Sequence, residues 1–361
     1  MVNVYVIIPV YNCKQYLCQA IESVIPQANI CLIDDGSTDG SGELCDELAA
    51  KDKRVHVIHQ KNSGVSAARN AGIEYVIKEG DTEKDYVAFL DADDFWKTDT
   101  ISRDMLDKMN REEGVDIYAF GSTVCNEDAT RYMYPLVYDE QYCEGGNGAI
   151  WKPKGHFAAN LYALHLFSDW NIRFRIGLKY SEDKIFLLQC YFFANRIRFM
   201  PQVLYFYRKN NTSVMSRMSE VDPIDYYLPI IRGWIDSDDF INKCESVTGK
   251  RTKAGRVLAS IYFGDMAADH FKRWGKADRL LNVLHNHQHY DLFIHMEPKD
   301  VSPRQYREHN LYIYHSRVFQ AKYYLIGAVE FCARQILSIK AASRLRDKHR
   351  FALSREYFEK V

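Results

Sequence analysis

The chain has 361 residues, of which 47% are hydrophobic, enough for a substantial core in one or two domains, so a disordered protein is excluded. The formal net charge of −1 excludes a global positive field, and nucleic acid is therefore not an expected partner. The nine cysteines are scattered without a Cys-x-x-Cys pair, which is typical of reduced thiols in a cytosolic protein.

The first 125 residues predict strands that alternate with helices. β-favouring apolar runs lie at 4–9, 30–33, 55–58, 86–90 and 115–120. Helical periodicity separates them, at 14–24, around Leu44 and Leu48, at 66–77 and at 101–109. This alternation predicts an α/β fold with a mostly parallel sheet covered by helices on both faces.

The pattern changes twice after residue 125. Residues 126–154 are polar and contain glycine, so we expect a long loop that faces the substrate. A helix at about 183–194 and strand-like runs at 198–200 and 203–207 follow. From residue 219 only helical patterns remain, at about 224–241, 254–273, 276–286 and 303–340. We therefore predict a first domain at 1–218 and an all-helical C-terminal region at 219–361.

No targeting or membrane-spanning segment is predicted. The first ten residues lead directly into a strand pattern, and the most apolar late stretch, 323–337, is short and contains Glu330 and Arg334. Residues 340–361 carry seven Lys or Arg against three Asp or Glu. We expect a cytoplasmic protein. The C-terminal helices either form a bundle on the first domain or make a peripheral contact with the inner face of the membrane.

Polar clusters follow three of the predicted strands. They are Val-Tyr-Asn at 10–12, Asp-Asp-Gly-Ser-Thr-Asp at 34–39 and Asp-Ala-Asp-Asp at 91–94. The carboxyl ends of parallel strands share one edge of a sheet, where α/β proteins bind ligands. Carboxylates two apart, such as Asp91 and Asp93, can share Mg²⁺ or Mn²⁺ with phosphate oxygens, while the next one orients a hydroxyl or a basic neighbour. The alternative is a solvated acidic turn that caps a helix.

Residues 35–46 also match a calcium-binding EF-hand loop in part. The matching positions are occupied by Asp35, Ser37, Asp39, Gly40, Glu43 and Asp46. An EF-hand needs a helix before the loop, whereas 30–33 is a strand pattern, and Asp46 replaces the usual final Glu. We therefore reject this interpretation.

Two later segments carry further polar candidates. Glu182 and Asp183 open a helix, where acidic residues either complement the helix dipole or supply a general base at the crevice wall. The run Tyr-Phe-Tyr-Arg at 205–208 either clamps an anion or simply ends a strand.

Taken in order, these segments resemble glycosyltransferase family 2, the inverting enzymes of GT-A fold. The resemblance covers about residues 3–215 and includes the segments 8–12, 34–39, 62–70, 91–94 and 182–183. It implies a Rossmann-like GT-A domain with a nucleotide-sugar half at about 1–125 and an acceptor half at about 126–218. Thr98 stands where many relatives have Pro, which affects only the start of a helix.

The resemblance also implies roles for single residues. Pro9 and Tyr11 would surround the donor base, Asp35 would hydrogen-bond it, and Asp91 would lie near the ribose. Asp93 would bind the metal, Mn²⁺ or Mg²⁺, that bridges the diphosphate. Asp183 would be the catalytic base, and Arg208 would approach the leaving diphosphate.

The expected function is a metal-dependent, inverting, non-processive transfer of a sugar from a UDP-sugar to a glycan or lipid-linked glycan acceptor in bacterial-type surface polysaccharide synthesis. The processive synthase motif Gln-x-x-Arg-Trp is only imitated at 270–274, where His270 replaces Gln. A sugar-nucleotide pyrophosphorylase is one alternative, although residues 10–14 lack the glycines that such an enzyme would carry. A catalytically silent nucleotide-sugar binding or scaffold protein is the other.

Overall fold

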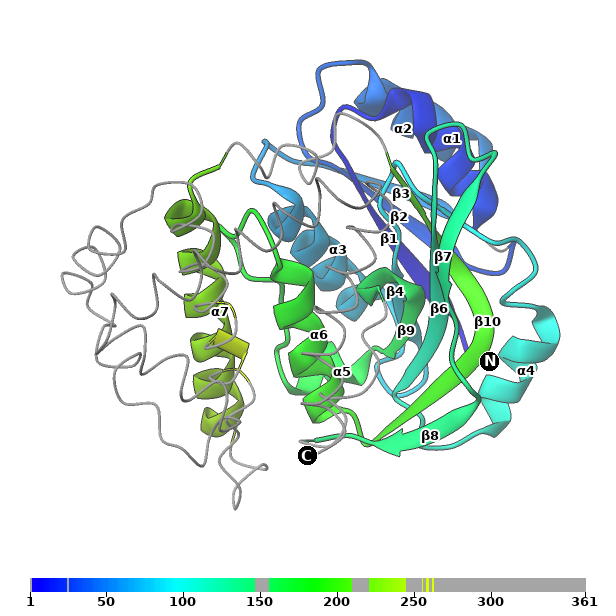
Figure 1. Cartoon of the computed structure of the whole chain (residues 1–361). Coiled ribbons are helices and arrows are strands. Elements are labelled where there is room, and N and C mark those ends of the chain that lie inside the picture. Colours follow the sequence, from blue (N-terminus) through cyan, green and yellow to red (C-terminus); the bar gives the residue numbers. More distant parts are fainter. Residues whose placement is uncertain are drawn as a thin grey trace, which may run out of the picture. The chain divides into compact units, whose positions relative to one another are not determined.

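The computed structural model describes residues 2–24, 26–146, 156–209 and 221–244, together with residues 255, 258, 259 and 262. The chain divides into two compact units, Met1–Ser219 and Glu220–Val361. Figure 1 shows the described elements along the chain.

The first four long strands of the N-terminal unit form a parallel sheet. They lie in the order β3-β2-β1-β4, and all three pairings are parallel. Every residue of the central strand β1 is buried, which explains its continuous apolar sequence. The strands are β1 (Val4–Val10), β2 (Asn29–Asp34), β3 (Val55–His59) and β4 (Tyr86–Phe89).

Beyond β4 the sheet is mixed. Strand β9 (Asn160–Ala163) lies antiparallel between β4 and β6 (Ile117–Cys125), and β10 (Arg196–Arg208) runs parallel to β6. The short strand β5 (Phe95–Trp96) pairs with β10 at the edge of the main strand order. The predicted mostly parallel sheet is thus mixed: the first four strands and the β6–β10 pair are parallel, and the remaining pairings are antiparallel.

Helices cover both faces of this sheet. Helices α1 (Lys14–Ser23) and α2 (Ser41–Lys51) follow β1 and β2, whereas α3 (Val65–Glu79) returns the chain from β3 to β4. Right-handed crossovers therefore place α1 and α2 on one face and α3 on the other, as Figure 1 shows. Helix α6 (Glu182–Phe193) lies on the side of α3.

Helix α3 packs very closely on β1. A Cβ atom added to Gly72 would lie 2.4 Å from Cγ2 of Ile7, closer than real Cβ contacts. The absence of a side chain at Gly72 therefore sets the distance between α3 and the central strand.

An aromatic cluster joins β4 to α6 under the predicted crevice. The rings of Phe174 and Phe186 are stacked with centroids 3.9 Å apart, and Phe89 meets both edge-on. The other members are Phe157, Tyr162 and Phe167. Because this core connects the strand before Asp91 with the helix that carries Asp183, it holds the two predicted site segments at a constant separation.

Most strands and helices predicted for residues 1–125 are confirmed, but the loop predicted at 126–154 is partly wrong. It contains β7 (Tyr132–Leu136) and β8 (Gln141–Glu144), which pair with β6 and β10. The side chains of β8 are mostly exposed, so no apolar alternation marks this strand in the sequence. Strand β9 and the short helices η2 (Phe157–Ala159) and α5 (His165–Asp169) were not predicted either, and α4 (Arg103–Arg111) begins two residues later than expected.

In the second unit the helix predicted at 224–241 is confirmed as α7 (Pro223–Lys243), whose first turn is capped by Asp222 through a bond from Ile224 N. The helices predicted at 276–286 and 303–340, nearly all of that at 254–273, and the basic tail lie outside the described residues. No helix in the described ranges is long and apolar enough to cross a bilayer.

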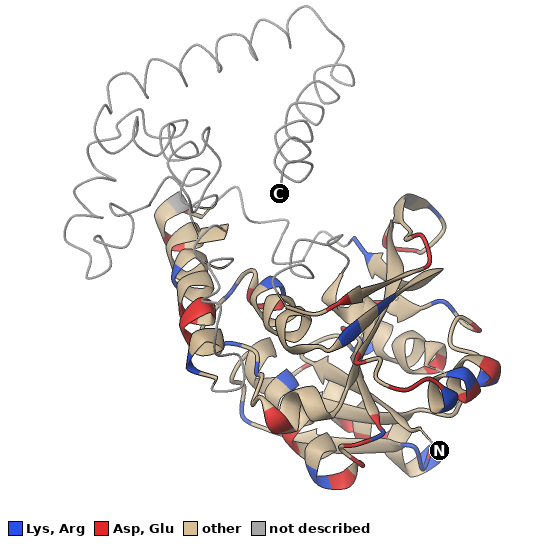
Figure 2. Cartoon of the chain, turned by 90° about the horizontal axis from the view of Figure 1, so that it is seen from below, with Lys and Arg blue, Asp and Glu red and all other residues tan. Residues whose placement is uncertain are grey.

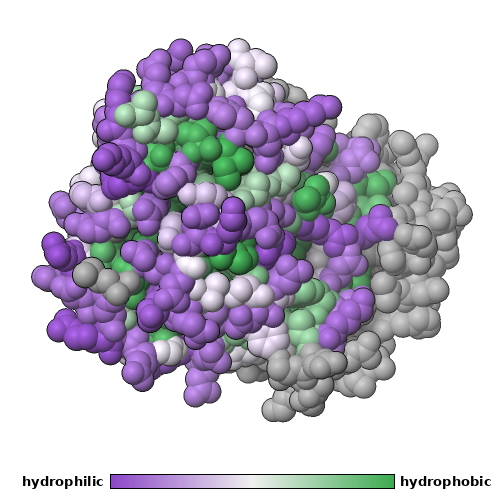
Figure 3. All heavy atoms as spheres, turned by 180° about the vertical axis from the view of Figure 1, so that it is seen from behind, coloured by the Kyte–Doolittle hydropathy of each residue, from purple (hydrophilic) through white to green (hydrophobic). Residues whose placement is uncertain are grey.

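The surface of the N-terminal unit is charged and mixed. In Figure 2, acidic and basic residues are both distributed over the described elements of this unit. On the face shown in Figure 3, hydrophobic residues are visible as small separate areas between hydrophilic ones.

Candidate active site

The polar clusters predicted from the sequence meet at the carboxyl edge of β1, β2 and β4. Val10 pairs with Asp34 across the β1–β2 ladder, and Asp35 N donates to Val10 O at 2.9 Å. On the other side of β1, Leu90 N donates to Ile7 O at 3.0 Å. Pro9 pairs with Ile33 inside the buried ladder, and Tyr11, which follows the last ladder residue Val10, is 52% exposed. The expected convergence at one sheet edge is therefore present.

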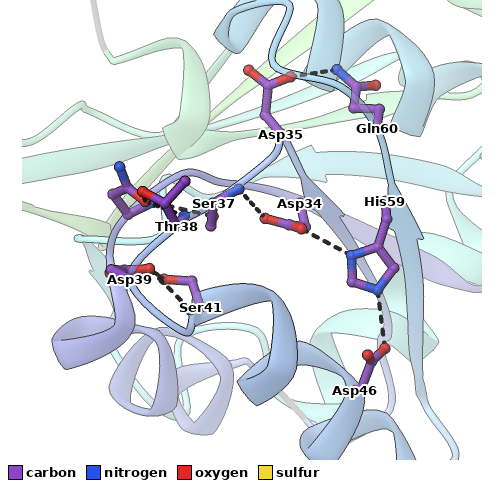
Figure 4. Close-up of polar contacts among 10 residues, drawn as sticks. Asp34, Asp35, Ser37, Thr38, Asp39, Ser41, Asp46, His59 and Gln60 are labelled. Carbon is purple, nitrogen blue, oxygen red and sulfur yellow. Dashed lines mark hydrogen bonds and ion pairs between the residues drawn. The ribbon is translucent and has the colours of Figure 1, made fainter.

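The loop at 34–40 is held by its own polar side chains, as Figure 4 shows. Asp34 accepts from Ser37 N at 3.0 Å, and Asp39 accepts from Ser41 N at 2.9 Å. Thr38 N donates to the Asn12 side chain at 2.8 Å, which ties this loop to the segment after β1. The carboxylates of Asp34 and Asp39 thus stabilise the turn between β2 and α2 by hydrogen bonds. This role accounts for them without a calcium-binding loop.

His59 connects two of the acidic residues (Figure 4). Its Nδ1 lies 2.9 Å from Asp34 Oδ2, and its Nε2 lies 3.0 Å from Asp46 Oδ1. Hydrogen bonds to Asp34 and Asp46 raise the pKa of His59 above 6.5. His59 was not predicted as a partner, because it lies in β3 and contacts the loop only through the tertiary fold.

Asp35 is buried and binds the segment that starts α3. Its Oδ1 accepts from Gln60 Nε2 at 2.7 Å and from Ser63 N at 2.8 Å, while Oδ2 accepts from Gly64 N at 2.8 Å. The predicted base reader therefore also orders the turn before α3, a role that the sequence did not indicate.

The loop of residues 91–94, called the acidic loop below, is anchored through its last carboxylate. Asp94 is only 1% exposed, and it accepts from Tyr205 OH at 2.5 Å and from Arg208 N at 2.7 Å. Burial and the charges of Asp93 and Asp91 raise the pKa of Asp94 well above its ordinary value. The sequence predicts that the residue after Asp93 orients a hydroxyl or a basic neighbour, and Asp94 accepts from the Tyr205 hydroxyl and from the backbone N, not the guanidinium, of Arg208.

Arg69 joins the acidic loop to the predicted catalytic segment. Its Nη2 donates to Asp91 Oδ1 at 2.6 Å and its Nη1 to Glu182 Oε1 at 3.1 Å. The guanidinium also lies 4.6 Å from the ring centroid of Phe157 and 5.1 Å from that of Phe174. Arg69 therefore brings Asp91 and the start of α6 into one cluster.

In this cluster, burial and the charge of Arg69 shift the pKa values of the carboxylates in opposite directions. Burial alone would raise the pKa of Asp91, but the charge of Arg69 outweighs it and the pKa is lowered. At Glu182 burial is the larger effect, and the pKa is raised despite Arg69. Arg69 was not predicted as a site residue. The available signal was a charged residue in the stripe 69, 72, 73 and 76, whose other members are apolar and buried.

Asp183 occupies the first turn of α6, next to Glu182. Its Oδ1 accepts from Lys184 N at 2.8 Å, and Ser181 before the helix has φ = 60°, in the left-handed region. The negative charge of Asp183 acts on Arg69, which shows that Asp183 and the Arg69 cluster share one electrostatic environment. Asp183 therefore directly follows Glu182, whose side chain Arg69 joins to Asp91.

His156 is a further residue of this crevice. Its ring is stacked on Tyr205 with centroids 4.5 Å apart and planes at 22°. Burial lowers the pKa of His156, and the charges of both Asp91 and Asp183 act on it in the opposite direction. No local pattern in the sequence distinguishes this histidine.

Arg208 lies beside the acidic loop at the end of β10. Its Nε donates to Asp93 O at 2.8 Å, and its backbone N holds Asp94. The side chain is buried, with contacts from α1 and from the segment after β6.

The donor set of the acidic loop fits a divalent cation that shares its coordination with a ligand. Asp91 and Asp93 offer hard carboxylate oxygens two residues apart, as Mg²⁺ and Mn²⁺ prefer. Within the described ranges, no group of three or more His, Cys, Asp or Glu side chains could hold a metal. Phosphate oxygens and water would therefore have to complete the coordination.

Comparison with known proteins agrees with this geometry. Residues 5–175 match the family model described as Glycosyl transferase family 2. Among curated relatives, the uncharacterized glycosyltransferase EpsJ of Bacillus subtilis is 28% identical over 229 residues, 58% of this chain and 62% of EpsJ. The putative teichuronic acid biosynthesis glycosyltransferase TuaG of the same organism is 35% identical over 113 residues, 30% of this chain and 42% of TuaG.

Each of these two alignments covers less than two thirds of the relative's own length. Among solved structures, residues 1–349 of TarS from S. aureus in complex with UDP-GlcNAc superpose with a TM-score of 0.61. Sequence identity is 18%, and the match covers 90% of this chain and 89% of the TarS chain, which supports the fold alone.

Proposed function

Residues 5–175 form a domain of glycosyltransferase family 2, and from this premise we propose that the protein transfers a sugar from a UDP-sugar to a hydroxyl of a glycan acceptor with inversion. The observation that carries the proposal is the Arg69 bridge, in which one guanidinium holds both Asp91 and Glu182. It supports a single crevice with a donor side at the acidic loop and a base at Asp183.

The proposed donor site lies at the edge of β1, β2 and β4. The base would lie against Pro9 and the exposed ring of Tyr11, near Asp35, and the ribose would lie near Asp91. Asp35 reaches this position from a loop that Asn12 and Ser37 hold in place, so the donor base would meet an ordered turn.

A divalent cation held by Asp93 would stabilise charge on the leaving diphosphate. On the acceptor side, Asp183 takes the proton of the attacking hydroxyl. The acceptor oxygen forms a bond to the anomeric carbon while the bond from that carbon to the phosphate oxygen breaks, and the nucleoside diphosphate leaves with the electron pair. A single displacement of this kind turns an α-linked donor into a β-glycoside.

The proposed acceptor is a bacterial-type surface polysaccharide or its lipid-linked precursor. The name of the relative TuaG, which refers to teichuronic acid biosynthesis, supports this class of acceptor. Transfer is proposed to be non-processive, because His270 interrupts the motif of processive synthases.

The substitution Asp183→Asn tests the base assignment. It removes the proton acceptor but keeps the shape of the side chain, so transfer should fall at least about 100-fold while Mn²⁺-dependent UDP binding, measured by calorimetry, stays near wild type. The anomeric proton coupling of the wild-type product checks inversion. Unchanged turnover in Asp183→Asn would show that another group accepts the proton.

A further inference from the structure

Arg208 has an unusually complete set of contacts for a residue expected at a diphosphate. It is 3% exposed, and each of its three guanidinium nitrogens donates to a protein oxygen. The acceptors are the Asp93 carbonyl for Nε at 2.8 Å, the Glu127 carbonyl for Nη1 and the Gln19 side chain for Nη2 at 2.5 Å.

Aromatic rings enclose the same guanidinium. Its central carbon lies 4.9 Å from the ring centroid of Tyr16 in α1 and 5.3 Å from that of Phe95 in β5. Both distances are within the range of cation–π attraction. The group is therefore held by α1, by β5 and by the segment after β6.

The acidic loop is fixed from this position at two consecutive residues. The Nε of Arg208 donates to the backbone carbonyl of Asp93, and the backbone N of Arg208 donates to the carboxylate of Asp94. Tyr205, three residues earlier in β10, donates to the other oxygen of Asp94 and lies 3.4 Å from Asp91 N through its hydroxyl. The end of β10 thus determines the backbone geometry from which the Asp93 side chain extends.

We propose that Arg208 is a positioning residue of the acidic loop, which it joins to α1 and the segment after β6, and that it acts on the donor through Asp93. This inference rests on the proposed function, since it concerns how the proposed metal carboxylate is oriented. A guanidinium suits the task because its planar fork donates in three fixed directions, whereas a lysine ammonium cannot reproduce them.

Calorimetry of UDP binding with and without Mn²⁺ separates this role from a diphosphate contact. In Arg208→Lys the affinity for UDP without metal should equal that of wild type, because the donor contacts elsewhere are intact. The gain in affinity on adding Mn²⁺ should fall by about 10-fold or more, as for other residues that orient metal ligands. Tyr205→Phe is a smaller substitution that removes the hydroxyl contacts with Asp94 and with Asp91 N, and it should also reduce the gain in affinity on adding Mn²⁺.

Arg198→Lys is the matched control. Arg198 is in the same strand and equally buried at 3% exposed, but it pairs with Glu112 at 2.5 Å and with Glu140, away from the acidic loop. This variant should lose thermal stability and keep the full Mn²⁺ gain.

Two results would overturn the inference. Weaker metal-free UDP binding in Arg208→Lys, with the Mn²⁺ gain intact, would show a direct diphosphate contact. An unchanged gain in both Arg208→Lys and Tyr205→Phe would show that neither side chain positions the acidic loop for the metal. If wild type binds no UDP under either condition, the proposed donor itself is wrong, which is a distinct outcome.

Discussion

The guanidinium of Arg69 is surrounded by two carboxylates and two phenyl rings, with 4% of its side chain exposed. This buried guanidinium forms ion pairs with Asp91 in the acidic loop and with Glu182 at the start of α6. Removing one partner from a buried ion pair is far more costly than breaking a pair in water, because the remaining charges have no solvent.

Arg69→Met should therefore leave Asp91 and Glu182 without their cation and lower the free energy of unfolding by about 3–5 kcal/mol. Urea unfolding followed by tryptophan fluorescence measures this loss. Lys84→Met, which breaks an exposed pair with Asp81, is the control and should leave the midpoint unchanged. A midpoint for Arg69→Met equal to that of the control would mean that the bridge does not stabilise the fold.

His59 predicts a pH dependence at the residue scale. Its pKa is raised in the folded chain by Asp34 and Asp46, so protonated His59 stabilises the fold fully below about pH 6.5. This contribution is lost as the pH rises through the folded pKa. The melting temperature of wild type should therefore exceed that of His59→Gln most clearly near pH 6, and the difference should shrink as the pH rises through the raised pKa of His59. A difference that grows with pH would contradict the hydrogen-bonded arrangement.

Among the elements, α3 connects the parts of the site. Its start binds Asp35 through Gly64 N, and its second turn carries Arg69. Asn70 adds two bonds of 2.8 Å to the backbone of Phe174, in the segment that leads toward α6. One helix thus determines the relative positions of the donor loop, the acidic loop and the segment before Asp183.

Gly72→Ala tests how closely α3 must approach β1. Alanine favours a helix by about 1 kcal/mol over glycine, but the added methyl would meet Ile7, and overpacking costs about 1–3 kcal/mol. We expect lower stability in urea and lower transferase activity. In a double-mutant cycle with Ile7→Ala, the two losses should be less than additive. Additive losses would show that the residues do not compete for space.

Apolar runs in the sequence predicted some strands of the sheet but not others. Strands β1, β2 and β4 were predicted because strands buried on both faces have continuous apolar sequences. Strand β9 has only four residues, and its place between β4 and β6 depends on partners far away in the chain. Strand β4 is equally short, but its sequence YVAF is entirely apolar, whereas β9 (NLYA) contains Asn160, so β9 lacks the continuous apolar run that identified β4.

At the scale of the whole molecule, the proposed function predicts stabilisation by ligand. UDP with Mn²⁺, each at about 100 times its dissociation constant, should stabilise the unit that binds it by about 2.7 kcal/mol for each binding equilibrium. A thermal shift assay over a panel of nucleoside diphosphates should give the largest shift with UDP and Mn²⁺ together. A larger shift with GDP would correct the donor base while leaving the family unchanged.

The sequence by itself determined the α/β class, the acidic clusters at strand ends and the family, because apolar periodicity and short motifs are local properties of the chain. Only the tertiary structure decided which charges meet. Arg69 reaches both Asp91 and Glu182, and Arg208 reaches the Asp93 backbone across more than one hundred residues of chain. Such contacts depend on the packing of α3 and β10 against their neighbours, and packing at long sequence separation leaves no local pattern to read.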